Sequence, residues 1–451
     1  MTAHTHGREF VRWLVLIGCS IAMTAAAVTT GGVYTHEFQW VGLAMACLAL
    51  LSAVVRSRRS TAPDSRDLVL LGLLVLWIIL QLVPLPATLV RLVSFYRWQD
   101  LERVRAAVGA SQESWMQISV APSVSVERLL HVLTGIAAYV TAREAGRWWP
   151  GSKIWRTTIP VLIAGTVEGA LGVLQFSPGV RVSGTYVNRN HYAGLLEMAY
   201  PLAIAWAFSI WSANAHRRHR EPMSMGTAIG VSLLLGSAAI MFFGIAVSQS
   251  RMGFLAAIAA SATMAAVYVA ARRRVDGPQG GQIWLAVAAI PIVLVLLFIT
   301  GPLAARFSLV PALGTADGRL QIAKETLKVI GAYPWTGCGL GALENGLYRF
   351  RASLPDVNVD FAHNDYLQVF AELGIPGGLL LAALGVWLIR GIYSAAFDFR
   401  SKYFLIGIGL LGSILAIGLH SFVDFNLYIP ANGVVLAWIA GIGASPTLRE
   451  E

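Results

Sequence analysis

Apolar runs long enough to cross a lipid bilayer recur along almost the whole of this 451-residue chain. The chain is 56% hydrophobic and only 13% charged, whereas soluble domains usually carry about 25% charged residues. A helix needs about 20 mainly apolar residues to cross the hydrocarbon core. The sequence therefore predicts an all-α integral membrane protein, a bundle of about 12 spanning helices. We place these spans at 11–30, 38–55, 67–84, 127–145, 155–177, 191–212, 226–247, 252–271, 282–301, 374–393, 403–420 and 427–445.

Short basic clusters between these runs set the predicted orientation. The formal charge is +10, but the basic residues are not interleaved with aromatic ones as in nucleic-acid-binding patches, so no nucleic acid partner is expected. Cytoplasmic loops of membrane proteins carry an excess of lysine and arginine. With a cytoplasmic N-terminus, all the basic clusters fall on the cytoplasmic side, namely 56–59, 143–156, 217–220, 272–274 and 390–402. This agreement favours an even number of spans, with both termini in the cytoplasm.

The first apolar run has a second interpretation, as a signal peptide. Arg8 and Arg12 precede it, residues 25–27 are alanines, and residues 16–19 resemble a lipoprotein processing box. However, only about five apolar residues separate Arg12 from that box, fewer than the roughly 7–15 of a signal core. The run also continues to about Thr30. We therefore interpret it as the first transmembrane helix.

Two segments between predicted spans are too long for simple connections, and in this orientation both lie on the outer side. One covers about 85–126 and is amphipathic, and the other covers about 302–373. Loops of this length are usually functional or disordered. A helical pattern at 318–330 and several aromatic residues favour order in the second. The chain then divides into 1–150, 151–301, 302–373 and 374–451, the third part being a large, partly helical loop on the outer side.

The stretch at 360–378 carries the densest group of polar side chains in the second long segment. Asp360 is a good N-cap residue, and apolar residues follow at helical spacing. Gly374 and Pro376 then end this short helix, so that the next span starts afresh. His363 and Asn364 are expected in its first turn, at the membrane surface. Imidazole titrates near neutrality and suits proton transfer, although a histidine that merely caps the helix is the alternative.

Three further clusters fall at or near the outer face, at 181–194, at 248–253 and at 318–341. Arg251 stands out because an arginine at a helix start gains nothing from the helix dipole. It also opposes the positive-inside bias, which indicates that it faces an anion, the alternative being snorkelling to outer headgroups. Arg319 and Lys324 could instead form the solvated face of a loop helix. Arg189 has the same two interpretations.

Other candidates give weaker signals. The glycines at 337, 339 and 341 resemble a phosphate-binding loop, but no strand precedes them, so a tight turn is favoured. Asp356 and Asp360 could hold a divalent cation, yet no further ligands converge. The cysteines at 19, 47 and 338 support neither a disulfide framework nor a metal site, so no metal or cofactor is expected. Glu168 and Glu197 lie in apolar segments, where carboxylates are costly and usually functional; substrate binding and pairing within the bundle both remain open.

Taken together, the four outer clusters resemble the O-antigen ligase and polymerase superfamily of bacterial inner-membrane glycan transferases. His363-Asn364, followed after nine residues by Gly374-x-x-Gly377, matches the histidine–amide–glycine pattern of the family's large periplasmic loop, which implies that residues 302–373 form a periplasmic loop here. The Gly-Thr-x-x-Asn-x-Asn-His run at 184–191, Ser250-Arg251, Gly318-Arg319 and the Pro-Trp-Thr-Gly-x-Gly run at 334–339 are also similar. The resemblance covers roughly 160–430, whereas residues 1–150 match only in being hydrophobic helices.

The resemblance implies transfer of a glycan from undecaprenyl pyrophosphate to an acceptor hydroxyl, without a nucleotide or a required metal. The acceptor would be lipid A–core or a growing polysaccharide. His363 would be the base or an orienting group, and Arg251 and Arg319 would hold the pyrophosphate. Arg189 departs from the family, which more often has an uncharged residue there, and it is a further candidate phosphate contact.

Several side chains near these motifs are expected to support the site, namely Asn190, His191, Lys324 and Asp424. Asp424 follows His420 between the last two predicted spans, where both could brace the site from below. A polymerase that joins repeat units shares the fold and the motifs, so the sequence does not separate it from a ligase. A transporter or flippase is the main alternative of another class, and a noncatalytic assembly partner is a third. No related halves of the kind common in transporters are visible.

Overall fold

The computed structural model describes residues 2–55, 65–110, 114–177, 180–217, 223–276, 310–351 and 359–448. Helices dominate these residues. The long ones are α1 (Thr2–Val28), α2 (Thr35–Val54), α3 (Arg66–Leu82), α6 (Pro122–Trp148), α7 (Ile159–Leu174), α8 (Arg189–Arg217), α9 (Met225–Ser248), α10 (Arg251–Asp276), α13 (Val310–Ala332), α15 (Asp365–Phe397), α16 (Phe404–His420) and α17 (Pro430–Gly443).

The remaining elements are mostly short. They are α4 (Ala87–Val93), α5 (Phe95–Val108), α14 (Leu343–Leu347), and the 3-10 helices η1 (Thr30–Gly32), η2 (Gly151–Thr158), η4 (Asn426–Tyr428) and η5 (Pro446–Leu448). Two antiparallel strands, β1 (Leu85–Pro86) and β2 (Trp115–Met116), pair Leu85 with Met116 and close the base of the α4–α5 arm. The all-α class predicted from the sequence is confirmed for the described residues.

The predicted spans agree with the helices wherever the structure describes them. Seven described helical segments are long and apolar enough to cross a membrane, in α1, α2, η2–α7, α8, α9, α10 and α15. The predicted spans 67–84, 127–145, 403–420 and 427–445 coincide with the other long helices α3, α6, α16 and α17. The predicted span 282–301 lies outside the described residues. The chain is thus a multi-pass membrane protein, and the number of twelve spans remains a prediction.

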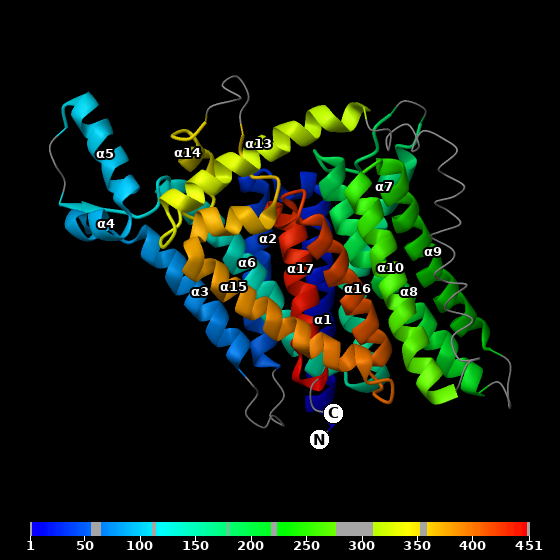
Figure 1. Ribbon diagram of the computed structural model, residues 1–451. Helices are drawn as coiled ribbons and strands as arrows, with labels where there is room; N and C mark the ends of the chain where they lie inside the picture. The colour runs from blue at the N-terminus through cyan, green and yellow to red at the C-terminus, as the bar shows by residue number, and fades with distance from the viewer. Residues whose placement is uncertain are drawn as a thin grey trace.

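The long helices run side by side, and α13 crosses them at one end (Figure 1). We call this end the α13 end. The marks for both chain termini lie at the opposite end, which we call the termini end, and α4 and α5 project sideways beyond the top of α3. Within the bundle, α8 packs against α9 and α16, and α17 packs against α6. Its buried core includes Tyr192 and Tyr200 of α8 and Trp438 of α17.

The helix that follows His363 begins later than the sequence predicts. Asp360 was expected to be its N-cap, but the N-cap is Asn364, whose side-chain oxygen accepts a hydrogen bond from the N–H of Leu367 at 3.0 Å. The residues before Asn364 are not part of the helix. They are held against it by a hydrogen bond that the N–H of Ala362 donates to the side chain of Gln368. His363 therefore lies just before the helix instead of inside its first turn.

A kink at Gly374 separates the first part of α15 from its membrane-spanning part, as the sequence predicts. Gly374 has a φ of 66°, which glycine adopts without strain. A side chain there would also lie only 2.7 Å from the backbone nitrogen of Gly337. The close approach joins the kink to the loop after α13, which fixes the base of the stretch that carries His363.

The predicted orientation can be tested by thiol labelling in intact spheroplasts. In a chain with Cys47 replaced by serine, Tyr348→Cys at the α13 end should react with a membrane-impermeant maleimide. Asp398→Cys, near the termini end, should react only after lysis. Tyr348 is 59% exposed and Asp398 is also exposed, so access through the protein does not limit either reaction. The opposite labelling pattern would place residues 302–373 in the cytoplasm.

Candidate active site

The carboxylate of Asp424 brings together four of the side chains that the sequence singles out. It follows the end of α16 and its side chain is only 1% exposed. His363 Nδ1 lies 3.4 Å from Oδ1, and His191 Nε2 lies 3.6 Å from the same oxygen. The amide of Asn190 donates a short hydrogen bond to Oδ2, and Arg319 Nη2 lies 3.8 Å from it. Parts of the chain more than 230 residues apart thus meet at one buried charge.

The surroundings of Asp424 favour its ionised form. Burial alone would raise the pKa of this carboxyl, but the imidazoles of His191 and His363 outweigh burial and hold the pKa well below its usual range. The backbone N–H of Phe425 also donates to Oδ1 at 3.0 Å. At neutral pH the group is therefore a carboxylate that accepts hydrogen bonds from its neighbours.

His363 is held in a defined orientation beside this carboxylate. Its φ is 50°, a left-handed conformation that is uncommon outside glycine, and its ring contacts the Phe425 ring edge-on at 4.9 Å. Because the carboxylate can only accept, a hydrogen bond between them requires the proton on Nδ1, which leaves the Nε2 lone pair available. Nε2 makes no hydrogen bond with any described residue, and the side chain is 31% exposed. A substrate can therefore reach it.

Asn364 holds the loop that carries His363. Besides capping α15, its amide nitrogen donates to the carbonyl of Phe422 at 2.9 Å. The N–H of Asp365 donates to the carbonyl of Ser421 at 2.9 Å. These bonds join the start of α15 to the segment just before Asp424, and so fix the distance between His363 and the carboxylate.

The start of α8 supplies Asn190 and His191, and the loop before it is pinned to the bundle. Glu168 of α7 accepts hydrogen bonds from the hydroxyl of Thr185 at 2.7 Å and from its N–H at 3.1 Å. The side chain of Asn432 donates to the carbonyl of His191 at 2.9 Å. Of the two roles that the sequence leaves open for Glu168, the structure shows pairing within the bundle.

A second buried pair lies beneath Asp424, one helical turn back along the chain. His420 Nδ1 is 3.0 Å from Glu197 Oε1, and both side chains are fully buried. Glu197 therefore also pairs within the bundle. Residues 420–424 connect this pair to the candidate site. His420 therefore lies below the site, where the sequence predicts a supporting residue.

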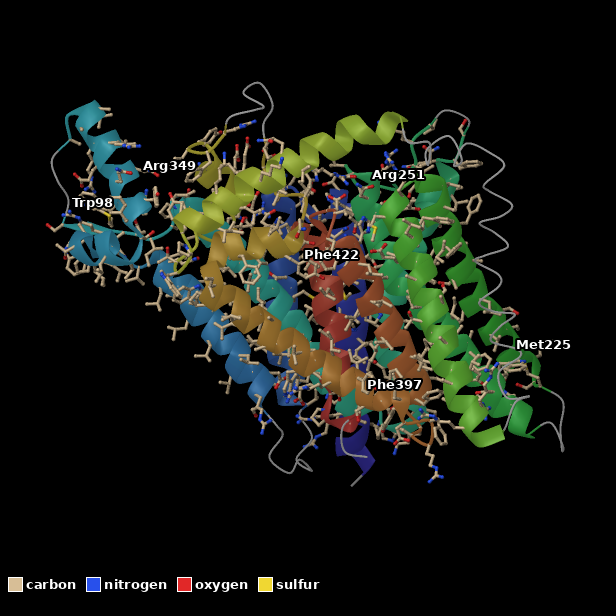
Figure 2. The ribbon with its side chains drawn as sticks, in the orientation of Figure 1. Trp98, Met225, Arg251, Arg349, Phe397 and Phe422 are labelled. Atoms are coloured by element: carbon tan, nitrogen blue, oxygen red, sulfur yellow. The ribbon has the colours of Figure 1, made fainter. Side chains whose placement is uncertain are left out.

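The predicted cations occupy different surroundings. Arg319 is 42% exposed beside Asp424, whereas Lys324, one turn and a half further along α13, is exposed. Arg251 begins α10 and forms no hydrogen bond or ion pair with the part of the chain that the structure describes. Figure 2 shows Arg251 at the α13 end, the end towards which Phe422 also lies. Arg189 begins α8, directly before Asn190.

The start of α10 lies close to α8. A side chain at Gly253 would approach the Ala193 side chain to 2.7 Å and Glu197 Oε2 to 3.4 Å. Glycine allows this close contact because it has no Cβ. Arg251, two residues earlier, is therefore positioned near the first turns of α8, where Asn190 and His191 lie.

The glycine-rich loop at 337–341 is a structural turn, as the sequence favours. Its backbone N–H groups are all hydrogen-bonded within the protein, and their acceptors are the carbonyls of Tyr333, Ala371 and Glu372 and the side chains of Gln81 and Glu372. Anion-binding loops instead point free N–H groups at the ligand. This loop therefore fixes the α15 kink and has no N–H left to hold a phosphate.

An aromatic cluster and the arginine beside it also adjoin His363, and neither is predicted from the sequence. The rings of Phe361 and Phe425 stack at 4.1 Å, and the Arg128 guanidinium lies 5.9 Å from the centre of the Phe361 ring. Arg128 Nη1 is 3.4 Å from His131 Nδ1 and 3.5 Å from the carbonyl of Tyr428. The sequence does contain a signal that could have identified Arg128. It lies at the outer end of a predicted span, against the positive-inside bias, just as Arg251 does.

No group of three or more His, Cys, Asp or Glu side chains within the described ranges is arranged to hold a metal ion. Asp356, one of the two acids considered as cation ligands, lies outside the described residues. Asp360 is exposed. The three cysteines are free thiols, and Cys19 and Cys338 are buried.

Comparison with known families agrees with the resemblance read from the motifs. Residues 236–382 match the family described as O-antigen ligase. The match includes Arg251, Arg319 and His363, and it ends before Asp424. No curated protein matches the chain. This multi-pass membrane protein therefore carries, at residues 236–382, a domain of the O-antigen ligase superfamily.

Proposed function

We propose that this protein is a glycosyltransferase that moves a glycan from undecaprenyl pyrophosphate to an acceptor hydroxyl at the periplasmic face of the bacterial inner membrane. The observation that carries the proposal is the contact of His363 Nδ1 with the buried Asp424 carboxylate, with Arg319 alongside. A ligase and a polymerase would use this site alike, since both attack the same donor with a sugar hydroxyl.

In the proposed reaction His363 Nε2 accepts the proton of the acceptor hydroxyl. The hydroxyl oxygen forms the new glycosidic bond to the sugar carbon, while the bond from that carbon to the phosphate oxygen breaks. Undecaprenyl pyrophosphate leaves with the electron pair. Asp424 stabilises the imidazolium that forms and keeps the proton on Nδ1 beforehand, as the orienting acid does in a catalytic triad.

The leaving group gains negative charge as it departs, and arginines are suited to hold it. Guanidinium groups bind phosphate oxygens two at a time. In our proposal Arg319 turns from Asp424, which it meets at 3.8 Å, to the pyrophosphate. Arg251 holds the second phosphate, which accounts for an arginine at a helix start without a described protein partner. Arg189 is a further candidate contact.

The prenyl tail of the donor needs an apolar path beside the site. Between α2 and α6 lies a groove of about 250 Å³, lined by Phe38, Gln39, Gly42, Leu43, Ala46, Glu127, Leu130, His131, Leu133 and Thr134. Leu43 and Leu130 are exposed on the bundle surface, which faces lipid in a membrane. Arg128 adjoins both this groove and the aromatic cluster next to His363. We propose that part of the tail lies in this groove.

The arginine clamp can be tested with purified protein at limiting lipid-linked donor. Arg251→Ala and Arg319→Ala should each reduce the transfer rate roughly 10–150-fold, because each removes about 1.5–3 kcal/mol of charge-assisted hydrogen bonding. Lysine at either position should restore activity only in part, since it offers a point charge instead of a fork. Lys328→Ala, an exposed cation of the same helix α13, is the matched control and should be unaffected. Normal rates in both alanine variants would rule out the clamp.

A further inference from the structure

Arg128 of α6 lies beside the candidate site without a described acid to balance its charge. Its Nη1 makes two long contacts, with the carbonyl of Tyr428 at 3.5 Å and with His131 Nδ1 at 3.4 Å. Its Nε is buried and makes no hydrogen bond with a described residue, and the guanidinium forms no ion pair with one. An arginine side chain carries five N–H donors and stays charged at every physiological pH. Most of these donors are therefore unmatched among the described residues.

The buried acid of this region does not supply the missing partner. Glu372 Oε2 accepts hydrogen bonds from the N–H of Gly341 and from the hydroxyl of Tyr428, both at 2.7 Å. Its Oε1 accepts one from the side-chain amide of Gln368 at 3.0 Å. Arg128 packs against the same Gly341, where a Cβ would collide with Arg128 Cγ. A partly buried cation that is held in place without a carboxylate is costly, and it suits an anion that a ligand supplies.

The guanidinium lies where the groove proposed for the prenyl tail meets the aromatic cluster. The N–H of Val120, just before α6, donates to the carbonyl of Cys338 in the loop after α13, so α6 begins at the α13 end. Arg128 and His131 are neighbours on one side of this helix, three residues apart. His131 lines the groove. Arg128 therefore lies at the end of the groove that is nearer to the candidate site.

Two aromatic rings separate Arg128 from His363. The guanidinium lies 5.9 Å from the centre of the Phe361 ring, and this ring stacks on that of Phe425 at 4.1 Å. The His363 ring contacts Phe425 at 4.9 Å. In the proposed reaction the sugar carbon under attack lies at His363, and the two phosphates lie between that carbon and the tail. The position of Arg128 thus matches the phosphate that is further from the sugar.

We propose that Arg128 binds the phosphate to which the prenyl chain is esterified, as a third arginine of the donor site besides Arg251 and Arg319. The inference rests on the proposed function, because that function supplies a ligand with phosphates between a sugar and an apolar tail. A guanidinium fork can hold two oxygens of one phosphate. This side chain then lets the groove distinguish a phosphorylated prenyl chain from the neutral alcohol of the same length.

Equilibrium binding to the purified full-length protein tests this proposal without a transfer step. The ligands are undecaprenyl phosphate, which keeps only the phosphate next to the tail, and undecaprenol, which has none. Arg128→Gln should weaken binding of undecaprenyl phosphate roughly 10–150-fold, because it removes charge-assisted hydrogen bonds, and should change that of undecaprenol by about twofold or less. Arg128→Lys keeps the charge without the fork, so its affinity should be intermediate. Arg103→Gln, which removes an exposed arginine of α5, is the control.

Three results would overturn the proposal. The first is an unchanged affinity of Arg128→Gln for undecaprenyl phosphate, and the second is a wild type that binds both lipids alike. The third is an equal loss of undecaprenol binding in Arg128→Gln, because it would show that Arg128 only supports the fold of the groove. A wild type that binds the phosphate through Arg128 but forms no glycosidic bond would contradict the proposed transferase and confirm this site.

Discussion

His363→Ala is expected to slow glycan transfer by about 10²–10⁴-fold while donor affinity changes by no more than a few-fold. An acceptor hydroxyl is a poor nucleophile until its proton has an acceptor, and His363 Nε2 is the available lone pair beside Asp424. In the proposed mechanism the arginines and the lipid tail hold the donor, so we expect its binding not to depend on this imidazole. The measurement is single-turnover transfer from a purified undecaprenyl-linked glycan, with donor affinity determined in the same membranes.

A second substitution separates proton transfer from orientation. His363→Gln keeps a hydrogen-bonding side chain but cannot accept a proton at neutral pH, so it should be nearly as slow as His363→Ala if the histidine is the base. His36→Ala, which removes an exposed histidine outside the site, is the control. High activity of His363→Gln would reduce the role of His363 to orientation, and normal turnover by His363→Ala would remove the base from the mechanism.

Asp424→Asn should have an effect of similar size on transfer, about 10²–10⁴-fold, although Asp424 does not reach the substrate. The amide cannot stabilise an imidazolium as a carboxylate does, and it no longer fixes the proton on Nδ1 of His363. The loss should appear mainly in the single-turnover rate and little in donor affinity. Asp360→Asn, which changes an exposed acid in the segment before α15, three residues from His363, is the control.

The lowered pKa of Asp424 also predicts how the stability of the protein depends on pH. Because the fold lowers the pKa of Asp424, its ionised form stabilises the folded state. This contribution is fully present above the ordinary aspartate pKa of about 3.9 and is lost as pH falls through the lower folded-state value. Thermal unfolding should therefore show wild type more stable than Asp424→Asn at neutral pH, with the difference shrinking in strong acid. A difference that grows on acidification, or no difference at neutral pH, would contradict the described role of the carboxylate.

The sequence was sufficient to predict the helices because membrane spans are specified locally. Each needs about 20 apolar residues and little else, so the predicted 226–247 and the observed α9 nearly coincide. The predicted helix start at Asp360 was wrong because the choice of N-cap is not decided locally. Asp360 and Asn364 are both good N-cap residues, and the choice depends on bonds to distant segments, such as that of Asn364 with the carbonyl of Phe422.

The side chains of the candidate site were nominated from the sequence, but their arrangement was not. Asp424 appeared only as a supporting residue, because nothing local shows that one carboxylate would meet His191, Arg319 and His363. Those contacts join segments that are distant in the chain, and their geometry follows from helix packing. Arg128 was missed for the same reason, since its relation to the site arises only where α6 packs near η4.

The most direct test of the central claim is whether the purified protein alone transfers the glycan. In vesicles that contain only this protein, an undecaprenyl-pyrophosphate-linked glycan and an acceptor glycolipid, we expect glycan-bearing acceptor and free undecaprenyl pyrophosphate to form in equal amounts. His363→Ala in the same vesicles should form neither at a comparable rate. Movement of intact lipid-linked glycan between leaflets, with no new glycosidic bond, would contradict the account and identify a transporter.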